Sequence, residues 1–318
     1  MSERSLHVIF GTGPLGKSVM RAALARGYAV RMVNRSGEAD VPAGVEVVAA
    51  DLYQPDDVRR VASGAAVTYQ CAQPEYSAWA EKFPPLQAAI IDGVAGSGAR
   101  MVVGDNLYMI DNTHGAPIHE GLAHNYTTKK GKMRAEMADR VLEAHRTGAL
   151  STALVRASDF YGPEVLGSAV GERTFPPLLT GKPVQVIGDP DVAHTVTYID
   201  DFGMAMVMVG ERESALGQSW HVPTAGVTTM RDFLTLAASV AGTELKVSRV
   251  QPWMLRMLGI FVPNVREIAE MLYQFNTPYV VDHSKFVREF GDIATSYAAG
   301  LRATIDWYRA HSTAQKAA

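Results

Sequence analysis

Short apolar runs alternate with longer stretches of mixed polarity through the first half of the chain. The runs have the length of buried strands, and several stretches between them have the spacing of helices. We expect strands at residues 7–10, 29–33, 45–49, 67–71 and 100–103. Strands separated by helices are joined by right-handed crossovers and form a parallel sheet that is covered on both faces. The pattern therefore predicts an α/β fold with a doubly wound parallel sheet.

The clearest helix signal covers residues 15–26. Pro14 stands just before this stretch and Gly27 just after it. Proline suits the first turn of a helix because its φ is already helical and its missing N–H is not needed there, and glycine is favoured just past the last turn. The sequence therefore predicts a helix immediately after the first strand.

The pattern changes after about residue 155. Turn signals separate shorter apolar pieces there, at residues 161–163, 181–183 and 188–190. We therefore expect two domains, a first of residues 1–157 and a smaller, second one of residues 158–318. Strands of the second part, such as residues 219–222, could rejoin the first sheet.

Three stretches in the second half have the composition of apolar or amphipathic helices, namely residues 253–262, 265–275 and 301–309. Residues 311–318 are expected to fray. An apolar lid is expected from the side chains of Trp253, Met254, Leu255, Met257, Leu258 and Phe261. Such a lid would favour a small, partly apolar substrate over a highly polar sugar nucleotide.

Charge and composition limit the partners of the chain. Its 30 Lys and Arg stand against 33 Asp and Glu, so the excess of cations that nucleic-acid binding requires is missing. The longest nearly unbroken apolar stretch, residues 202–209, is far shorter than the roughly 20 residues that span a bilayer. The beginning of the chain has no apolar run typical of a secretory signal, and the single cysteine, Cys71, fits a reducing compartment. We expect a cytoplasmic protein without nucleic-acid or membrane partners.

A glycine-rich motif stands between the first predicted strand and the first predicted helix. It reads Gly11-Thr12-Gly13-Pro14-Leu15-Gly16, a GxGxxG pattern. The first glycine suits the turn, the second lets the backbone approach a pyrophosphate, and the third allows close packing of helix on strand. Free N–H groups at the positive end of the helix can then receive the phosphate. The motif predicts a dinucleotide-binding site, and a purely structural turn is the alternative.

The end of the second predicted strand bears on which dinucleotide is bound. It reads Asn34-Arg35-Ser36 and lacks the Asp or Glu that usually binds the ribose 2′-hydroxyl of NAD. Arg35 can pair with a 2′-phosphate, and Ser36 can add a hydroxyl. We expect NADP(H) to be preferred and NAD(H) to remain usable, and a solvated loop charge is the alternative for Arg35. Asp51, after the third strand, would accept a bond from the adenine amino group or cap a helix near Pro55.

These residues resemble, in their order and spacing, the extended short-chain dehydrogenase/reductase superfamily and its NAD-dependent epimerase/dehydratase-like group. The resemblance covers nearly the whole chain, through the GxGxxG motif, the Asp51-Leu52 pair, the run Arg156-Ala157-Ser158-Asp159-Phe160-Tyr161-Gly162-Pro163 and the run Tyr198-Ile199-Asp200-Asp201. It implies a Rossmann domain that binds the dinucleotide, with Asp51 and Leu52 at that site, and a smaller C-terminal substrate domain. It also implies hydride transfer at a carbonyl or carbinol carbon.

The catalytic signature of this superfamily is YxxxK on a helix. Residues four apart share a helix face, and the lysine charge lowers the pKa of the tyrosine. Tyr126 and Lys130 match the pattern and lie ahead of a strong helical stretch, residues 132–144. Tyr126 would exchange a proton with the substrate oxygen, and Lys130 would hold the ribose hydroxyls.

The alternative to this pair is structural. Gly131 interrupts the proposed helix, and a family glutamate at Glu136 would instead select Lys132, whose partner four residues earlier is Thr128. Tyr126 would then pack at a loop edge, and the basic residues around it would form a solvated face.

The sequence departs from the common family pattern at two points. Most extended members have GxxGxxG, whereas Phe10 stands here where the first glycine would fall. The family's catalytic Ser or Thr after the fifth strand is not evident, and Asp105 and Asn106 stand there instead. Asn106, or with less support Asp105, would polarise the substrate carbonyl. Tyr108 follows the same strand and is a second candidate proton donor, with a half-buried structural tyrosine as its alternative.

The remaining polar residues have simpler interpretations. His114, His119 and His124 are five residues apart in a loop, which does not fit a helical metal pair, so we expect no metal site. Asp200-Asp201 is most simply a helix N-cap. His194 is more simply a core or surface histidine than a substrate contact.

The sequence thus predicts an NADP(H)-preferring oxidoreductase that transfers hydride at a carbonyl or alcohol of a small, partly apolar molecule. Two alternatives stay open. The first is an epimerase or dehydratase that restores its dinucleotide within each turnover, and the second is a regulator that senses the dinucleotide without chemistry. The sequence is also compatible with a homodimer.

Overall fold

The computed structural model describes residues 4–250 and 272–312. The predicted helix at residues 253–262 and the apolar lid lie outside the described residues, as do most of the predicted helix at 265–275 and the end of the chain that was expected to fray. Residues Leu272–Phe275 form a short 3-10 helix, η3.

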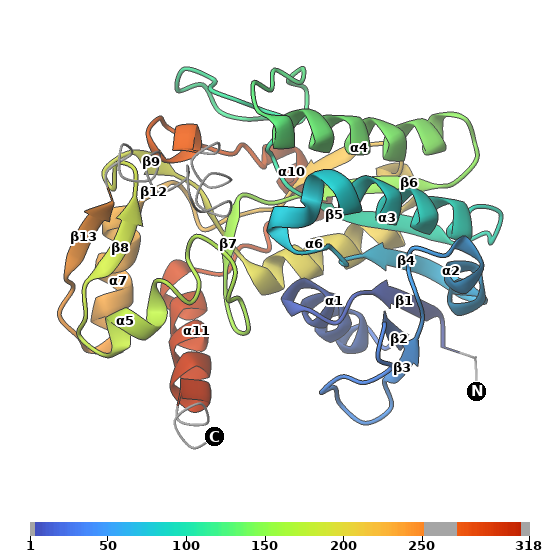
Figure 1. Cartoon of the computed structure of the whole chain (residues 1–318), viewed down its shortest axis with the longest axis horizontal. Helices are drawn as coiled ribbons and strands as arrows, with labels where there is room; N and C mark the ends of the chain where they lie inside the picture. The colour runs from blue at the N-terminus through green and yellow to red at the C-terminus, as the bar shows by residue number, and fades with distance from the viewer. Residues whose placement is uncertain (1–3, 251–271, 313–318) are drawn as a thin grey trace. The chain divides into compact units, whose positions relative to one another are not determined.

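The chain folds into two compact units, and its course passes between them several times (Figure 1). Unit 1 comprises residues 1–109, 129–157 and 202–222. Unit 2 comprises residues 110–128, 158–201 and 223–318.

Unit 1 is built on a seven-stranded parallel sheet with the strand order β11-β6-β5-β4-β1-β2-β3. Its strands are β1 (Leu6–Phe10), β2 (Ala29–Asn34), β3 (Glu46–Ala49), β4 (Ala65–Gln70), β5 (Arg100–Asp105), β6 (Thr152–Arg156) and β11 (Ser219–His221). The five strands predicted from the sequence are confirmed to within about two residues at each end. The order reverses direction at β1, which makes the carboxyl end of β1 and β4 the place where such sheets bind ligands.

Helices cover both faces of this sheet, with α3 and α4 on one face and α1 and α6 on the other (Figure 1). They are α1 (Pro14–Ala25), α2 (Pro55–Ala62), α3 (Trp79–Val94) with the preceding turn η1 (Tyr76–Ala78), α4 (Lys129–Arg146), α6 (Ile199–Glu211) and the short η2 (Glu213–Ala215). The helix predicted at residues 15–26 is confirmed as α1, which begins one residue earlier because Pro14 takes its first position. None of the helices that the structure describes combines the length and apolarity needed to cross a bilayer.

A buried ion cluster holds α4 to the sheet. The carboxylate of Asp105, at the end of β5, binds the guanidinium of Arg134 from α4 and accepts a bond of 2.9 Å from Nε of Arg156 in β6. The Asp105 side chain is 1% exposed. Burial alone would raise its pKa, but the two guanidinium charges outweigh burial and hold the pKa below its ordinary value.

Unit 2 consists of three two-stranded sheets and helices around an aromatic core. Its strands are β7 (Asp159–Tyr161), β8 (Val184–Ile187), β9 (Ala193–His194), β10 (Val196–Tyr198), β12 (Thr228–Thr229) and β13 (Val247–Val250), paired as β10-β7, β12-β9 and β13-β8. Its helices are α5 (Phe175–Leu179), α7 (Met230–Ala241), α10 (Ser284–Phe290) and α11 (Tyr297–Ser312), and α11 contains the predicted helix at residues 301–309. The core includes Tyr161, Phe175 and Phe233, each at most 1% exposed.

Asp201 corrects one expectation about helix capping. It lies inside the first turn of α6 and is not the N-cap of that helix. Its carboxylate instead accepts bonds from the backbone N–H of Thr295 at 2.8 Å and from its hydroxyl at 2.7 Å, just before α11. Burial raises the pKa of Asp201 to about 6, although the two bonds from Thr295 act in the opposite direction.

We predict that Asp105→Ala lowers the free energy of unfolding by about 3–5 kcal/mol, because two guanidinium groups are then buried without their counter-charge. Chemical denaturation measures this change. Asp56→Ala is the matched control, since Asp56 pairs with Arg59 at 2.5 Å but its side chain is 95% exposed, and it should change the free energy by at most about 1 kcal/mol. Equal changes in the free energy of unfolding for the two substitutions would contradict a stabilising role of the buried ion cluster.

We predict that Asp201 makes the protein less stable as the pH rises from about 4 to about 6. The folded state holds a proton on Asp201 in this range, and the unfolded state has released it, so the stabilising contribution fades as the pH passes the folded pKa. Denaturation at several pH values should show a smaller loss of stability over this range in Asp201→Asn. Asp306→Asn, whose side chain is 64% exposed, should keep the wild-type pH dependence.

Candidate functional site

The predicted glycine motif forms a tight bend at the amino end of α1. Gly11 has φ +110°, and a Cβ there would lie 2.8 Å from the backbone nitrogen of Ala72. A Cβ on Gly16 would lie 2.1 Å from the carbonyl oxygen of Gly11. Both positions therefore require glycine, the first for its φ and for the approach of the segment after β4, the second for the packing of α1 on the bend.

Gly13 differs from the other two glycines because a Cβ there would meet nothing within 4 Å. It is the N-cap of α1, and no side chain caps the helix at this position. The first turn of α1 also contains no acidic residue. The bend thus presents open space in front of backbone N–H groups at the positive end of a helix, which fits a phosphate group of a dinucleotide.

The neighbouring motif residues shape the bend. Pro14 begins α1. Leu15 packs beside Gly104 of β5, where a Cβ would lie 2.7 Å from its side chain. The hydroxyl of Thr12 accepts a bond of 3.0 Å from the amide of Asn34 at the end of β2.

Asn34 organises the loop after β2. Its side-chain nitrogen also donates to the Glu38 carbonyl at 2.8 Å, and its side-chain oxygen accepts from the Gly37 N–H at 2.7 Å and from the Ser36 hydroxyl at 3.2 Å. Asn34 is thereby used within the loop. Arg35, in contrast, is exposed, and among the residues that the structure describes no carboxylate forms an ion pair with it.

Asp51 and Leu52 lie between β3 and α2. The Asp51 carboxylate accepts a bond of 3.0 Å from the N–H of Tyr53, while the N-cap of α2 is Gln54. The alternative that Asp51 caps this helix is therefore wrong. The pKa of Tyr53 is raised, mainly by burial. The charge of Arg35 lowers this pKa and the charge of Asp51 raises it, so both charges act on the same phenol. Leu52 is buried at 7% exposure.

Asp105, Asn106 and Tyr108, the three candidates at the carboxyl end of β5, have different surroundings. Asp105 belongs to the buried ion cluster, so its carboxylate is committed to two arginines and does not suit the polarisation of a carbonyl. The side-chain oxygen of Asn106 accepts from the N–H of Tyr108 at 3.3 Å. The ring of Tyr108 lies 6.0 Å from that of Trp79.

Tyr126 and Lys130 do not share a helix face. α4 begins at Lys129, and Tyr126 lies in the coil before it with 37% exposure. Lys130 is 3% exposed, whereas Lys132 is 62% exposed and pairs with Glu136 at 3.8 Å on the surface. Its burial distinguishes Lys130 from the exposed Lys129 and Lys132.

Tyr76, which belongs to none of the sequence motifs, lies beside Lys130. The Lys130 ammonium lies 4.4 Å from the centroid of the Tyr76 ring. Tyr76 stands in η1, on the segment that follows β4. Trp79 follows Tyr76 by three residues, and Phe83 follows Trp79 by four. This spacing is the sequence signal that could have placed the three rings on one helix face.

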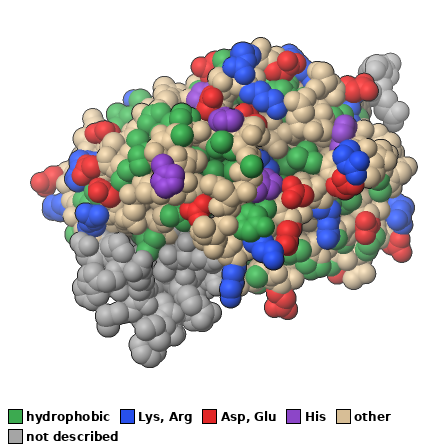
Figure 2. Space-filling view, turned by 90° about the horizontal axis from the view of Figure 1, so that it is seen from above, with side chains coloured by type: hydrophobic (Ala, Val, Ile, Leu, Met, Phe, Trp, Pro, Cys, Tyr) green, Lys and Arg blue, Asp and Glu red, His purple; other side chains and the backbone are tan. Residues whose placement is uncertain are grey.

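His194 is a core histidine of unit 2. It is 4% exposed, its Nε2 lies 2.9 Å from Oδ2 of Asp159, and its ring stacks on those of Phe275 and Tyr279. On the face shown in Figure 2, Lys and Arg side chains are interspersed with Asp and Glu, so the coloured residues present no basic patch there.

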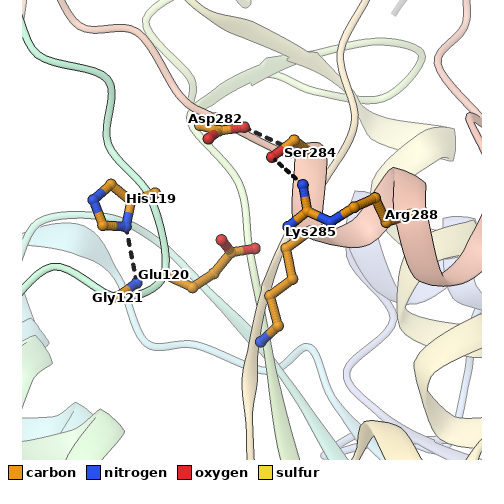
Figure 3. Close-up of a pocket in the computed structure, with 7 residues that line it drawn as sticks. All are labelled: His119, Glu120, Gly121, Asp282, Ser284, Lys285 and Arg288. Carbon is orange, nitrogen blue, oxygen red and sulfur yellow. Dashed lines mark hydrogen bonds between the residues drawn. The ribbon is translucent and has the colours of Figure 1, made fainter.

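In unit 2, a cavity of about 420 Å³ is lined by His119, Glu120, Gly121, Asp282, Ser284, Lys285 and Arg288 (Figure 3). Arg288 donates to the Ser284 hydroxyl at 3.0 Å. The cavity carries charges of both signs and so does not select an anion or a cation. Within the described ranges, 4–250 and 272–312, no group of three or more metal-binding side chains occurs.

The comparisons with known proteins agree with these motifs. No family model matches the chain. The chain is 25% identical over 198 residues to a dTDP-glucose 4,6-dehydratase of Streptomyces antibioticus, which covers 62% of this chain and 53% of that protein. The chain thus spans about half the length of this curated relative.

Two solved structures extend the likeness to the whole fold. DesIV, a dTDP-glucose 4,6-dehydratase of Streptomyces venezuelae with NAD and TYD bound, matches with a TM-score of 0.77 and 17% identity over 97% of this chain and 98% of that one. The UDP-glucose 4-epimerase of Thermus thermophilus in complex with NAD matches with a TM-score of 0.76 and 17% identity over 96% of this chain and 99% of that one. The chain therefore has the fold of the extended short-chain dehydrogenases/reductases of the NAD-dependent epimerase/dehydratase group, as its motifs predict.

Proposed function

We propose that this chain is a nicotinamide-dinucleotide-dependent enzyme that moves hydride at a carbonyl or hydroxyl-bearing carbon of a small molecule. The observation that carries the proposal is the bend at Gly11–Gly16, whose Gly13 leaves open space in front of the uncapped amino end of α1. When bound, the dinucleotide would supply or accept the hydride. The similarity to a dehydratase and an epimerase supports the same chemistry.

The residues of this chain would divide the remaining work. The N–H groups of α1 would hold the pyrophosphate, and buried Lys130 would bind the ribose hydroxyls. Asn106 would orient the substrate oxygen, and a tyrosine near the carboxyl end of the sheet would move its proton. Tyr126 and Tyr108 are the candidates that the sequence provides for this proton.

Two outcomes of the hydride step are distinguishable. An epimerase or dehydratase restores the dinucleotide within each turnover, and the similarities favour this outcome. A net oxidoreductase consumes one dinucleotide for each product. Product and dinucleotide oxidation should therefore be measured together, with UDP-glucose and dTDP-glucose in one panel and small aldehydes and ketones in another. Binding of the dinucleotide without turnover in either panel would favour a dinucleotide-sensing regulator.

We predict that Gly13→Ala abolishes most dinucleotide binding and leaves the melting temperature nearly unchanged. The added methyl group meets no protein atom within 4 Å but occupies the space that a phosphate needs. Titration calorimetry with NADH and NADPH measures the binding. Gly167→Ala, at a glycine of unit 2 where a Cβ also meets nothing within 4 Å, is the matched control and should bind the dinucleotide normally. Full binding by Gly13→Ala would contradict the proposed phosphate site.

We predict that NADP(H) is preferred over NAD(H) and that this preference depends on Arg35. Arg35 is exposed at the end of β2 without a carboxylate partner among the described residues, so it can pair with a 2′-phosphate. Arg35→Ala should weaken NADPH binding by roughly 1.5–3 kcal/mol and leave NADH binding nearly unchanged. Arg59→Ala, on the outer side of α2, should change neither. An equal loss for both dinucleotides would contradict the assignment.

A further inference from the structure

Two cations of α4 lie over a row of aromatic rings. Lys130 and Arg134 are four residues apart and share a face of α4. Lys130 lies over Tyr76, while Arg134 lies 5.7 Å from the Trp79 centroid and 4.6 Å from that of Phe83. Cation–aromatic contacts therefore join α4 to η1 and α3 along their length.

The two ends of this row differ in their surroundings. Arg134 is tied to Asp105 in the ion cluster, which gives it a structural function. Lys130 stands at the beginning of α4, and Tyr76 stands just after the carboxyl end of β4, the strand next to β1 and the glycine bend. The Lys130–Tyr76 contact thus lies on the part of unit 1 that approaches the ligand-binding edge of the parallel sheet.

We propose that Tyr76, with Lys130 beside its ring, is the catalytic acid and base of the proposed hydride step, in place of Tyr126. This inference rests on the proposed function. The positive charge, 4.4 Å from the ring centroid, stabilises the phenolate that forms when the proton leaves. Tyr126 precedes α4 in a coil and is 37% exposed, so it does not share a helix face with Lys130.

In the reducing direction, Tyr76 Oη would give its proton to the substrate oxygen. A bound reduced nicotinamide would supply the hydride, with its electron pair, to the carbonyl carbon and would itself become oxidised. The C=O bond would lose its π pair to the oxygen, and the substrate would become an alcohol. The Tyr76 phenolate then takes a proton from water. In the oxidising direction each transfer is reversed.

Tyr76→Phe keeps the ring and the contact with Lys130 but removes the hydroxyl. With whichever substrate of the two panels is converted, we expect kcat to fall by about 10²–10⁴-fold, while the Kd for the dinucleotide stays near the wild-type value. Tyr28→Phe, which removes a phenol hydroxyl that donates to Glu211 at 2.9 Å, is the matched variant and should keep kcat within a few fold of wild type. The fall in kcat should also be larger in Tyr76→Phe than in Tyr108→Phe or Tyr126→Phe. A normal kcat in Tyr76→Phe would overturn the inference and leave the row of cations and rings as a structural contact.

A spectroscopic titration tests Tyr76 without any turnover. The near-ultraviolet absorbance of tyrosinate, taken as wild type minus Tyr76→Phe, isolates the ionisation of the Tyr76 phenol. Lys130→Met should shift this ionisation to higher pH, and Lys132→Met, which changes an exposed lysine, should not. A Tyr76 phenol whose ionisation is the same in Lys130→Met as in wild type would refute the inference.

The two proposals fail in different ways. If wild-type protein shows no heat of binding with NADH or NADPH, the proposed function fails, and the catalytic assignment of Tyr76 fails with it. If the dinucleotide binds and Tyr76→Phe gives either refuting result, only the assignment of Tyr76 fails.

Discussion

The buried charges of Asp105, Arg134 and Arg156 determine where the rest of unit 1 can place its functional groups. They join the end of β5, the end of β6 and the face of α4 in a space where an unpaired charge would be strongly destabilising. Because Arg134 is fixed in this way, the lysine one turn earlier on α4 is directed toward the segment after β4. The same carboxylate that resembled a catalytic group in the sequence is thus the fixed point from which Lys130 is positioned.

The glycine bend depends on a different constraint, the close approach of backbone to backbone. Gly11 and Gly16 have no room for a Cβ, and Gly13 has room that the protein leaves empty. This contrast within one motif supports the proposed phosphate site, because packing alone does not require glycine at Gly13. Asn34 then fixes the loop after β2 through four hydrogen bonds, which leaves Arg35 outside the loop's own network.

The sequence predicted most strands of the parallel sheet because central strands such as β1 and β5 are largely buried and appear as short apolar runs. It predicted α1 to one residue, since proline and glycine mark its ends by local backbone geometry. The role of Asp105 could not be predicted in this way, because its partners are 29 and 51 residues away and single-sequence patterns do not encode such contacts. The role of Asp201 was predicted wrongly for the same reason, since Thr295 is 94 residues away.

The YxxxK pattern matches the chain in spacing, but the structure does not place both of its residues on one helix. A separation of four residues places two side chains on one face only if the helix includes both, and α4 begins after Tyr126. The pattern includes Lys130, which is buried, whereas Lys132 is exposed. The ring beside that lysine comes from Tyr76, more than fifty residues earlier in the chain. A buried ammonium needs groups that stabilise its charge, and the ring of Tyr76 is one such group for Lys130.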